Sequence, residues 1–285
     1  GNRNWIDLFG VVTIQPSEFL KIAVILHLAA YLSTQQNYLD ESRVWYRSLG
    51  IIGVAILLVI IGKDLGTVMI MLIAFIGLLA LAGAPGKIMR QVGIALLILI
   101  PAALMTSSSR MGRITAWLNP NAPDPLDYNW QAEHGMWAIS AGRIFGAGLG
   151  ESKMKWSWIP MIDNDYIFSV VGEELGLAGA ATLILLYVLL SFALVRILNR
   201  TNRLYERFVM FGILSWIAIQ SLINIGVVLN FLPVLGVPLP LISSGGTSLL
   251  ATLMTLGIAL GIESRNSNPQ LSTSGRSRSR VSVSR

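Results

Sequence analysis

Residues 160–176 read Pro-Met-Ile-Asp-Asn-Asp-Tyr-Ile-Phe-Ser-Val-Val-Gly-Glu-Glu-Leu-Gly, and they lead into a long apolar run at 166–196. A run of this length predicts a membrane-spanning helix, because a helix needs about 20 apolar residues to cross the hydrocarbon core. Asp165 is the last polar residue before the run, whereas Glu173 and Glu174 lie inside it. Ionisable groups at such depth are costly to bury, so all three carboxylates are functional candidates.

The composition extends this prediction to the whole chain. Of 285 residues, 54% are hydrophobic and 13% are charged, against about 25% charged in soluble domains. We therefore expect an all-α integral membrane protein, a polytopic bundle of about seven transmembrane helices, since helices pair every backbone amide inside lipid. The expected spans lie near residues 17–33, 49–63, 66–84, 91–107, 166–196, 208–229 and 247–263. The chain has no cysteine, which excludes disulfides and thiolate chemistry.

Charge predicts the orientation and the domains. The short loops at 34–48, 85–90 and 197–207 are basic, and the positive-inside rule places them in the cytoplasm. The segments expected outside are 1–16, the Lys63–Asp64 turn, 108–165 and 230–246. We expect a transmembrane domain at 1–263 and a disordered Ser/Arg-rich cytoplasmic tail at 264–285. Its composition cannot bury enough apolar area to fold, and we favour this tail over a nucleic-acid-binding segment.

The predicted outer loop at 108–165 is too long to be a simple connection. Loops of this length without obvious structure are usually functional or disordered, and abundant tryptophan argues against disorder. The tryptophans are Trp117, Trp130, Trp137, Trp156 and Trp158. Each is interpreted as a membrane-interface anchor, with sugar or lipid contact as the alternative.

A helix continued through Asp165 would place Ser169, Gly172, Glu173 and Gly176 on one face. The small residues would allow a close helix approach. Asp165 and Glu173 would then be about 12 Å apart, which exceeds the spacing of about 5–9.5 Å in glycosidase carboxylate pairs. These two carboxylates therefore do not form a hydrolase pair by themselves. Asp165 is the candidate for chemistry because it lies where substrate and water can reach it, and Glu173, like Glu174, is interpreted as internal hydrogen-bonding support.

Two further charged pairs lie at predicted span ends. Pro16 suits a first helical turn, and Glu18 and Lys21 follow as neighbours on one helix face. This pair either neutralises itself or frees Lys21 to bind an anionic group such as a diphosphate. Lys63 and Asp64 predict a second ion pair, followed by Gly66-Thr67, which would let the chain turn tightly.

The predicted outer loop at 232–248 combines three prolines with the run Ser-Ser-Gly-Gly-Thr-Ser. The hydroxyl groups of Ser243, Ser244 and Thr247, with the free amides around them, could bind an anion. A simple re-entrant turn explains the same composition equally well.

These residues fall into motifs that occur together in one family. The motifs are Gln15-Pro16-Ser17-Glu18, Asp64-Leu65-Gly66-Thr67, Gly146-Ala147-Gly148-Leu149-Gly150-Glu151-Ser152, Asp165-Tyr166-Ile167-Phe168 with Gly172-Glu173-Glu174-Leu175-Gly176, and Gly236-Val237-Pro238-Leu239-Pro240 with Gly245-Gly246. Over about residues 3–263 the chain resembles the SEDS proteins (shape, elongation, division and sporulation), and its motifs are more similar to the division branch (FtsW) than to the elongation branch (RodA).

The resemblance implies a peptidoglycan glycosyltransferase of the bacterial cytoplasmic membrane that polymerises lipid II into glycan strands, with its active site outside. It implies that Asp165 is the general base on the acceptor hydroxyl, that Lys21 assists the diphosphate, and that Glu18 and Asp64 line the same cavity. The implied partners are lipid II, the nascent glycan, a class B penicillin-binding protein (a transpeptidase) and other divisome proteins. Two alternatives are open for the cofactor: the reaction uses none, or it uses a divalent cation, Mg²⁺ or Mn²⁺. A lipid II flippase and a non-catalytic scaffold are the competing hypotheses.

The chain also departs from the family pattern. We expect it to lack about three N-terminal helices of the family's set. Asp163 replaces the usual His, and a second carboxylate there would raise the proton affinity of Asp165 by like-charge repulsion. Gly62-Lys63 stands where the family usually has Gln-Pro, just before the Asp64-Leu65-Gly66-Thr67 motif. Ser244 stands where the family usually has Tyr, just before Gly245-Gly246. We expect the charge of Lys63 to compensate for Asp163.

Overall fold

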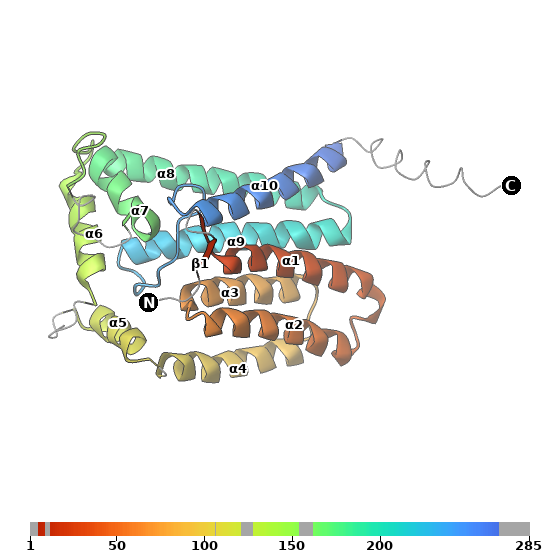
Figure 1. Cartoon of the computed structure of the whole chain (residues 1–285). Helices are drawn as coiled ribbons and strands as arrows, with labels where there is room; N and C mark the ends of the chain where they lie inside the picture. The colour runs from red at the N-terminus through yellow and green to blue at the C-terminus, as the bar shows by residue number, and fades with distance from the viewer. Residues whose placement is uncertain (1–4, 9–11, 106, 121–127, 154–161, 268–285) are drawn as a thin grey trace.

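The computed structural model describes residues 5–8, 12–105, 107–120, 128–153 and 162–267. This part of the chain is mostly helical, with one short β-hairpin (Figure 1). The elements are β1 Ile6–Leu8, β2 Val12–Ile14, α1 Pro16–Thr34, a 3-10 turn at Gln36–Tyr38, α2 Ser42–Ile61, α3 Leu65–Leu81, α4 Gly86–Met105, α5 Ser108–Leu118, α6 Trp130–Ala141, α7 Ile162–Asp165, α8 Ile167–Arg200, α9 Leu204–Val228 and α10 Gly246–Ser267.

Every predicted span coincides with a helix, which confirms the all-α membrane fold. Within the described residues, α1, α2, α4, α8, α9 and α10 are long and apolar enough to cross a membrane. The remaining predicted span is α3, which has 17 residues and is therefore about 26 Å long. This length is slightly below the hydrocarbon thickness of about 30 Å.

Helix α9 lies at the centre of the bundle, where it contacts α1, α3, α8 and α10. Its buried side chains include large apolar groups, among them Phe208 and Trp216. The same helix also buries Gln220, Ser221 and Asn224. Because buried polar groups need hydrogen-bond partners, these side chains have to bind polar atoms of their own helix or of the surrounding elements.

The two ends of the bundle differ in what they carry. One end, here called the α6 end, holds α5, α6 and α7 together with the α2–α3 turn and the α9–α10 loop (Figure 1). The opposite end, here called the basic end, holds the α1–α2, α3–α4 and α8–α9 connections. These are the two groups of segments that the charge pattern assigned to opposite sides of a membrane.

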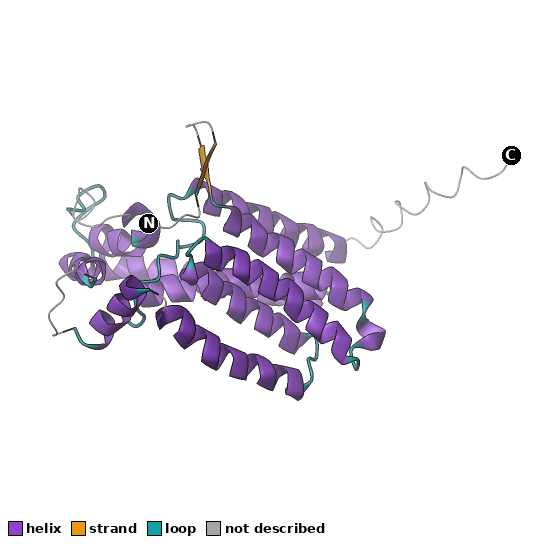
Figure 2. Cartoon of the chain, turned by 60° about the horizontal axis from the view of Figure 1, so that its bottom comes forward, coloured by secondary structure: helices purple, strands orange, loops and turns teal. Residues whose placement is uncertain are grey.

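A β-hairpin, which the sequence analysis did not predict, precedes α1 at the α6 end. Strands β1 and β2 are antiparallel, with Ile6 opposite Ile14, and they project from the bundle (Figure 2). At the other terminus, α10 continues to Ser267, beyond the predicted end of the membrane domain at residue 263. Residues 268–285, which make up most of the predicted tail, lie outside the described residues.

The predicted outer loop at 108–165 contains regular structure, because α5, α6 and α7 lie within it. The indole Nε1 of Trp117 donates to the carbonyl oxygen of Asn230 at 3.0 Å, so this side chain ties α5 to the end of α9. Trp130 and Trp137 are 38% and 54% exposed. Several charged or aromatic residues of the loop lie outside the described residues: Asp124, Asp127, Lys155, Trp156 and Trp158.

Candidate active site

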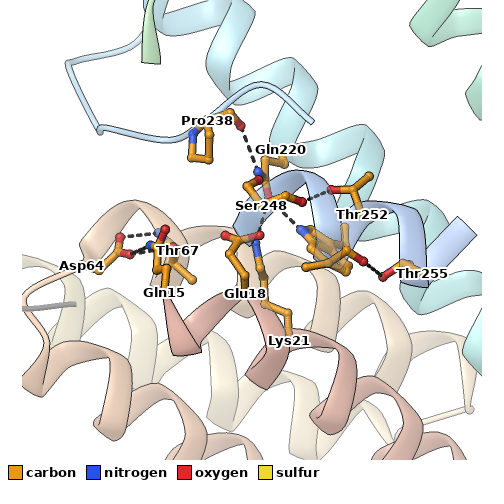
Figure 3. Close-up of polar contacts among 12 residues, drawn as sticks. Gln15, Glu18, Lys21, Asp64, Thr67, Gln220, Pro238, Ser248, Thr252 and Thr255 are labelled. Carbon is orange, nitrogen blue, oxygen red and sulfur yellow. Dashed lines mark hydrogen bonds and ion pairs between the residues drawn. The ribbon is translucent and has the colours of Figure 1, made fainter. Parts of the chain in front are cut away.

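Asp64 begins α3, and its carboxylate is satisfied without Lys63. Its Oδ1 accepts from the backbone N–H of Thr67 at 2.9 Å, the N-cap geometry that satisfies a free amide of a first helical turn. Its Oδ2 accepts from the Thr67 hydroxyl at 2.8 Å and from Nε2 of Gln15 at 3.1 Å. In Figure 3 the side chains of Gln15 and Thr67 both point toward Asp64, which is 4% exposed. The cluster joins the start of α1 to the start of α3.

The predicted Lys63–Asp64 ion pair is therefore wrong. Lys63 is exposed, makes no ion pair with Asp64 among the described residues, and takes the positive φ of 65° that turns the chain. Gly66 does not make this turn, contrary to expectation. A Cβ on Gly66 would lie 2.7 Å from the Leu235 carbonyl oxygen, so glycine here lets the α9–α10 loop approach α3.

Lys21 and Glu18 form a buried ion pair, the first of the two predicted alternatives. Their side chains are 2% and 0% exposed, and Lys21 Nζ lies 2.8 Å from Glu18 Oε1. Nζ also donates to Oε1 of Gln220 at 2.9 Å and lies 4.4 Å from the centre of the Trp216 ring. A buried charge is tolerated when it is paired and hydrogen-bonded in this way. Lys21 would have to exchange one of these partners to bind an anion.

Asp165 lies at the end of α7, outside the membrane-length helices, and its backbone is held by α9. Nδ2 of Asn224 donates to the Asp165 carbonyl oxygen at 2.8 Å. The preceding carbonyl, that of Asn164, accepts from the Ser243 hydroxyl at 2.5 Å. The carboxylate itself is less satisfied: Oδ1 of Asp165 is buried and has no hydrogen-bond partner among the described residues. Oδ2 faces Gly236, where a Cβ would lie 3.4 Å away.

Burial raises the pKa of Asp165 from 3.8 to about 6, because a carboxylate loses solvation when it is enclosed. The negative charge of Asp64 raises this pKa further, and the positive charge of Arg113 on α5 lowers it. The side chain of Asp163, which we expected to raise the proton affinity of Asp165, lies outside the described residues. Burial raises the pKa of Tyr166 as well, and the charge of Asp165 adds to that effect.

The hydroxyl groups of the α9–α10 loop are largely used within the protein. Ser243 accepts from the Leu239 N–H at 2.7 Å in addition to its bond to Asn164. Thr247 donates to the Thr13 carbonyl oxygen at 3.1 Å. Ser244 is exposed. The loop therefore packs against α7 and the hairpin, and of the three hydroxyls expected to bind an anion, Ser244 is the one exposed to a ligand.

Glu173 binds the segment that follows α6. Its Oε2 accepts from the Ser152 hydroxyl at 2.6 Å, and its Oε1 accepts from the Lys153 N–H at 3.0 Å. These bonds agree with a supporting role, which remains a prediction. The backbone carbonyl groups of Glu173 and Glu174 accept from Ala147 and Gly148 at 2.9 and 3.1 Å.

The continuous helix assumed from Asp165 onward is interrupted twice. Tyr166, with φ −115° and ψ 20°, separates α7 from α8, and Gly176 has φ 67° and ψ −166° inside α8. The estimate of about 12 Å between Asp165 and Glu173, which assumed an unbroken helix, therefore has no basis. The predicted face is buried as expected at Ser169, Gly172, Glu173 and Gly176, and α6 packs closely against it.

Gln220, Asn224 and Arg113 were missed as members of this site. The signal for the first two was a pair of amides four residues apart in an otherwise apolar span, which places both on one helix face. Arg113 gave no distinct signal among the other charged residues of its loop. Among the described residues, no cluster of three or more His, Asp or Glu side chains is arranged to hold a metal ion.

Known proteins are similar to this chain in sequence and in fold. The family model described as "Cell cycle protein", that of FtsW, RodA and SpoVE, matches residues 1–268. Stage V sporulation protein E of Bacillus subtilis is 39% identical over 263 residues, which are 92% of this chain and 71% of that protein. The probable peptidoglycan glycosyltransferase FtsW of Dichelobacter nodosus is 34% identical, over 93% and 68% of the two chains. The FtsW of Mycobacterium tuberculosis is 37% identical over 90% of this chain, which is 49% of its own length.

Solved structures of related proteins have a similar fold. A peptidoglycan synthase complex, studied for the coordination of polymerization and crosslinking, matches with a TM-score of 0.72 and 28% identity over 94% of this chain and 75% of that chain. The rod shape determining protein RodA of Thermus thermophilus matches with a TM-score of 0.64 and 26% identity, over 93% and 70%.

Proposed function

Because this chain belongs to the FtsW/RodA/SpoVE family of cell cycle proteins, we propose that it is a peptidoglycan glycosyltransferase that polymerises lipid II. Asp165 is the general base. The observation that carries this assignment is the buried Oδ1 of Asp165, which has no hydrogen-bond partner among the described residues. Several relatives bear the name probable peptidoglycan glycosyltransferase, and the acceptor sugar would supply the missing donor.

The reaction requires little of the protein beyond proton transfer and charge stabilisation. The acceptor C4 hydroxyl donates its proton to Asp165 as its oxygen forms a bond to C1 of the donor sugar, and the bond from C1 to the lipid diphosphate breaks. A pKa of about 6 leaves the carboxylate ionised at neutral pH while keeping its basicity near the operating pH, where a general base is most efficient.

The leaving diphosphate needs a cation. Among the described residues, Arg113 is the basic residue whose charge acts on Asp165, and the hydrogen bond found there for its Nη1 is a long one, 3.4 Å, to the Val234 carbonyl oxygen. We assign the diphosphate to Arg113, with Lys21 joining only if it leaves Gln220. Glu18 pairs with Lys21, and Asp64 tunes Asp165 through its negative charge. Lys63 and Ser244 are exposed at the same end and are proposed to contact the substrate there.

The same comparisons support a proposed cellular setting. The names of the FtsW relatives support a role in cell division, and the likeness to a synthase complex supports a transpeptidase of the class B penicillin-binding type as partner, with other divisome proteins around it. The basic residues at one end of the bundle support an orientation in the bacterial cytoplasmic membrane with the α6 end outside.

Proteoliposomes that contain the full-length protein and labelled lipid II test the proposal. We expect polymer to form with the wild-type protein and not with Asp165→Ala, while folding and binding of a partner transpeptidase persist. Movement of labelled lipid II across the bilayer without polymer would instead indicate a flippase. Polymer from Asp165→Ala at the wild-type rate would refute the assignment of the base.

A further inference from the structure

Helix α9 presents a row of polar side chains to the α9–α10 loop. Trp216, Gln220 and Asn224 follow one another at intervals of four residues and therefore lie on one helix face. All three are at most 1% exposed. Within a membrane-length helix, such buried amides are expected to be hydrogen-bonded and to have a specific role.

Asn224 joins two segments that are distant in sequence. Its Nδ2 donates to the carbonyl oxygen of Asp165 at 2.8 Å and to that of Val237 at 2.7 Å. Both hydrogens of one planar amide are thereby used, which fixes the orientation of the side chain. Asp165 also lies at a break between two helices, where Tyr166 has non-helical dihedrals. Its place therefore depends on tertiary contacts.

Gln220 continues this network one turn away. Its Nε2 donates to the carbonyl oxygen of Pro238 at 2.9 Å, as Figure 3 shows. Pro238 is the residue that follows Val237 in the chain. Its Oε1 accepts from Lys21 at 2.9 Å and from the Trp216 indole at 2.6 Å. An unbroken path of hydrogen bonds and one peptide link thus runs from the buried Glu18–Lys21 pair to the backbone of Asp165.

We propose that Asn224 is a positioning residue for Asp165, and that Gln220 anchors the same loop to the Glu18–Lys21 pair. This inference rests on the proposed function, in which Asp165 is the base. It gives the buried pair a role that needs no contact with substrate: Lys21 and Glu18 hold Gln220, Gln220 holds the loop at Pro238, and Asn224 holds the loop and Asp165 together. A displacement of a catalytic group by about 1 Å can lower a rate by about 100-fold, so such a clamp matters for turnover.

The kinetic test replaces Asn224 by Leu, which has the same number of side-chain heavy atoms, the same branching at Cγ and no donor. We expect kcat for lipid II polymerisation to fall by at least about tenfold with KM within about twofold of wild type, because substrate contacts are kept while the base is misplaced. Ser221→Ala is the matched control, since Ser221 is equally buried on α9 but donates to Ile217 of its own helix. An equal loss in the control, or a kcat at the wild-type level in Asn224→Leu, would overturn the proposal.

A second readout does not depend on activity. The chain has no cysteine, and a Cβ on Gly245 would lie 3.0 Å from Oδ1 of Asn164, so an Asn164→Cys, Gly245→Cys pair reports whether α7 stays against the loop. We expect oxidative cross-linking to slow several-fold when Asn224→Leu, or the milder Asn224→Ser, is added, and to keep its rate with Ser221→Ala.

Unchanged cross-linking rates in folded Asn224→Leu and Asn224→Ser would refute the positioning role of Asn224. The two proposals fail separately. If Asp165→Asn polymerises normally, Asp165 is not the base, while the cross-linking result still decides whether Asn224 positions this segment.

Discussion

At the residue scale, the site depends on the different environments of two carboxylates. Asp64 accepts three hydrogen bonds, whereas Oδ1 of Asp165 accepts none among the described residues. Hydrogen bonds stabilise the ionised form of a carboxylate, and burial without them destabilises it. The carboxylate of Asp64 is thus committed to hydrogen bonds within the protein, whereas that of Asp165 is open to the proposed proton transfer.

The pH dependence of polymerisation should follow the pKa of Asp165. The rate should fall as the pH drops through about 6, because the base becomes protonated. Asp64→Asn removes a charge that raises this pKa, so the acidic limb should move to lower pH; Arg113→Gln removes a charge that lowers it, so the limb should move to higher pH. Initial rates across the acidic range measure both shifts. Shifts of the same sign in the two variants would contradict the assignment.

Asp165 should also cost stability at neutral pH. A carboxyl group whose pKa is higher in the folded protein than its usual 3.8 favours folding when protonated, and this contribution is lost as the pH rises through about 6. Asp165→Asn should therefore raise the thermal unfolding midpoint at neutral pH, and the gain should shrink toward pH 4. Differential scanning fluorimetry in detergent measures it. A lower midpoint at neutral pH would show that the ionised carboxylate stabilises the fold.

At the scale of elements, the sequence predicted the spans well and their interruptions poorly. The helices follow from the lengths of apolar runs, a local property. Tertiary contacts accompany both breaks. Nδ2 of Asn224 donates to the Asp165 carbonyl oxygen, just before Tyr166, at 2.8 Å. Beyond Gly176, the N–H groups of Leu177 and Ala178 donate to the carbonyl groups of Arg143 and Ile144 at 2.9 and 3.1 Å. No run length or periodicity contains that information.

The contrast between local properties and tertiary contacts also explains which residues of the site were predicted from the sequence and which were missed. The Glu18–Lys21 pair spans one helical turn and was open to prediction from spacing. Gln220 and Asn224 donate to backbone carbonyl groups of the α9–α10 loop and of Asp165, which spacing within α9 does not indicate. The N-cap role of Asp64 was masked by the adjacent Lys63, whose charge suggested an ion pair.

Gly176 should be irreplaceable within α8. Its φ of 67° with ψ −166° belongs to a region that is essentially restricted to glycine, and a Cβ would lie 2.5 Å from the Ile144 carbonyl oxygen. Gly176→Ala should destabilise the protein by about 2 kcal/mol or more. Gly257→Ala in α10, where a Cβ would meet nothing within 4 Å, is the control and should be neutral or slightly stabilising. Thermal midpoints of the two variants decide between these expectations.

At the scale of the whole molecule, charge separates the two ends of the bundle. The basic connections lie at one end, and α7, the α9–α10 loop and Asp64 lie at the other. By the positive-inside rule, this arrangement supports our proposal that the chemistry takes place on the side away from the cytoplasm.

Orientation is open to direct measurement because the chain has no cysteine. Lys63→Cys, exposed at the α6 end, should react with a membrane-impermeant maleimide added to intact spheroplasts. Gln36→Cys, exposed at the basic end, should react only after permeabilisation. The reverse pattern would place the site in the cytoplasm and would be incompatible with the proposed function.

The central claim is that Asp165 removes the proton of the acceptor hydroxyl. The most direct measurement compares the lipid II polymerisation rate of Asp165→Asn, which keeps the shape of the side chain but not its basicity, with that of wild type and of Asp40→Asn. Asp40 is an exposed carboxylate at the basic end and serves as the control. We predict a loss of at least about 100-fold in Asp165→Asn and a wild-type rate in Asp40→Asn. A rate within about threefold of wild type in folded Asp165→Asn would contradict the account, since no loss of general-base catalysis is that small.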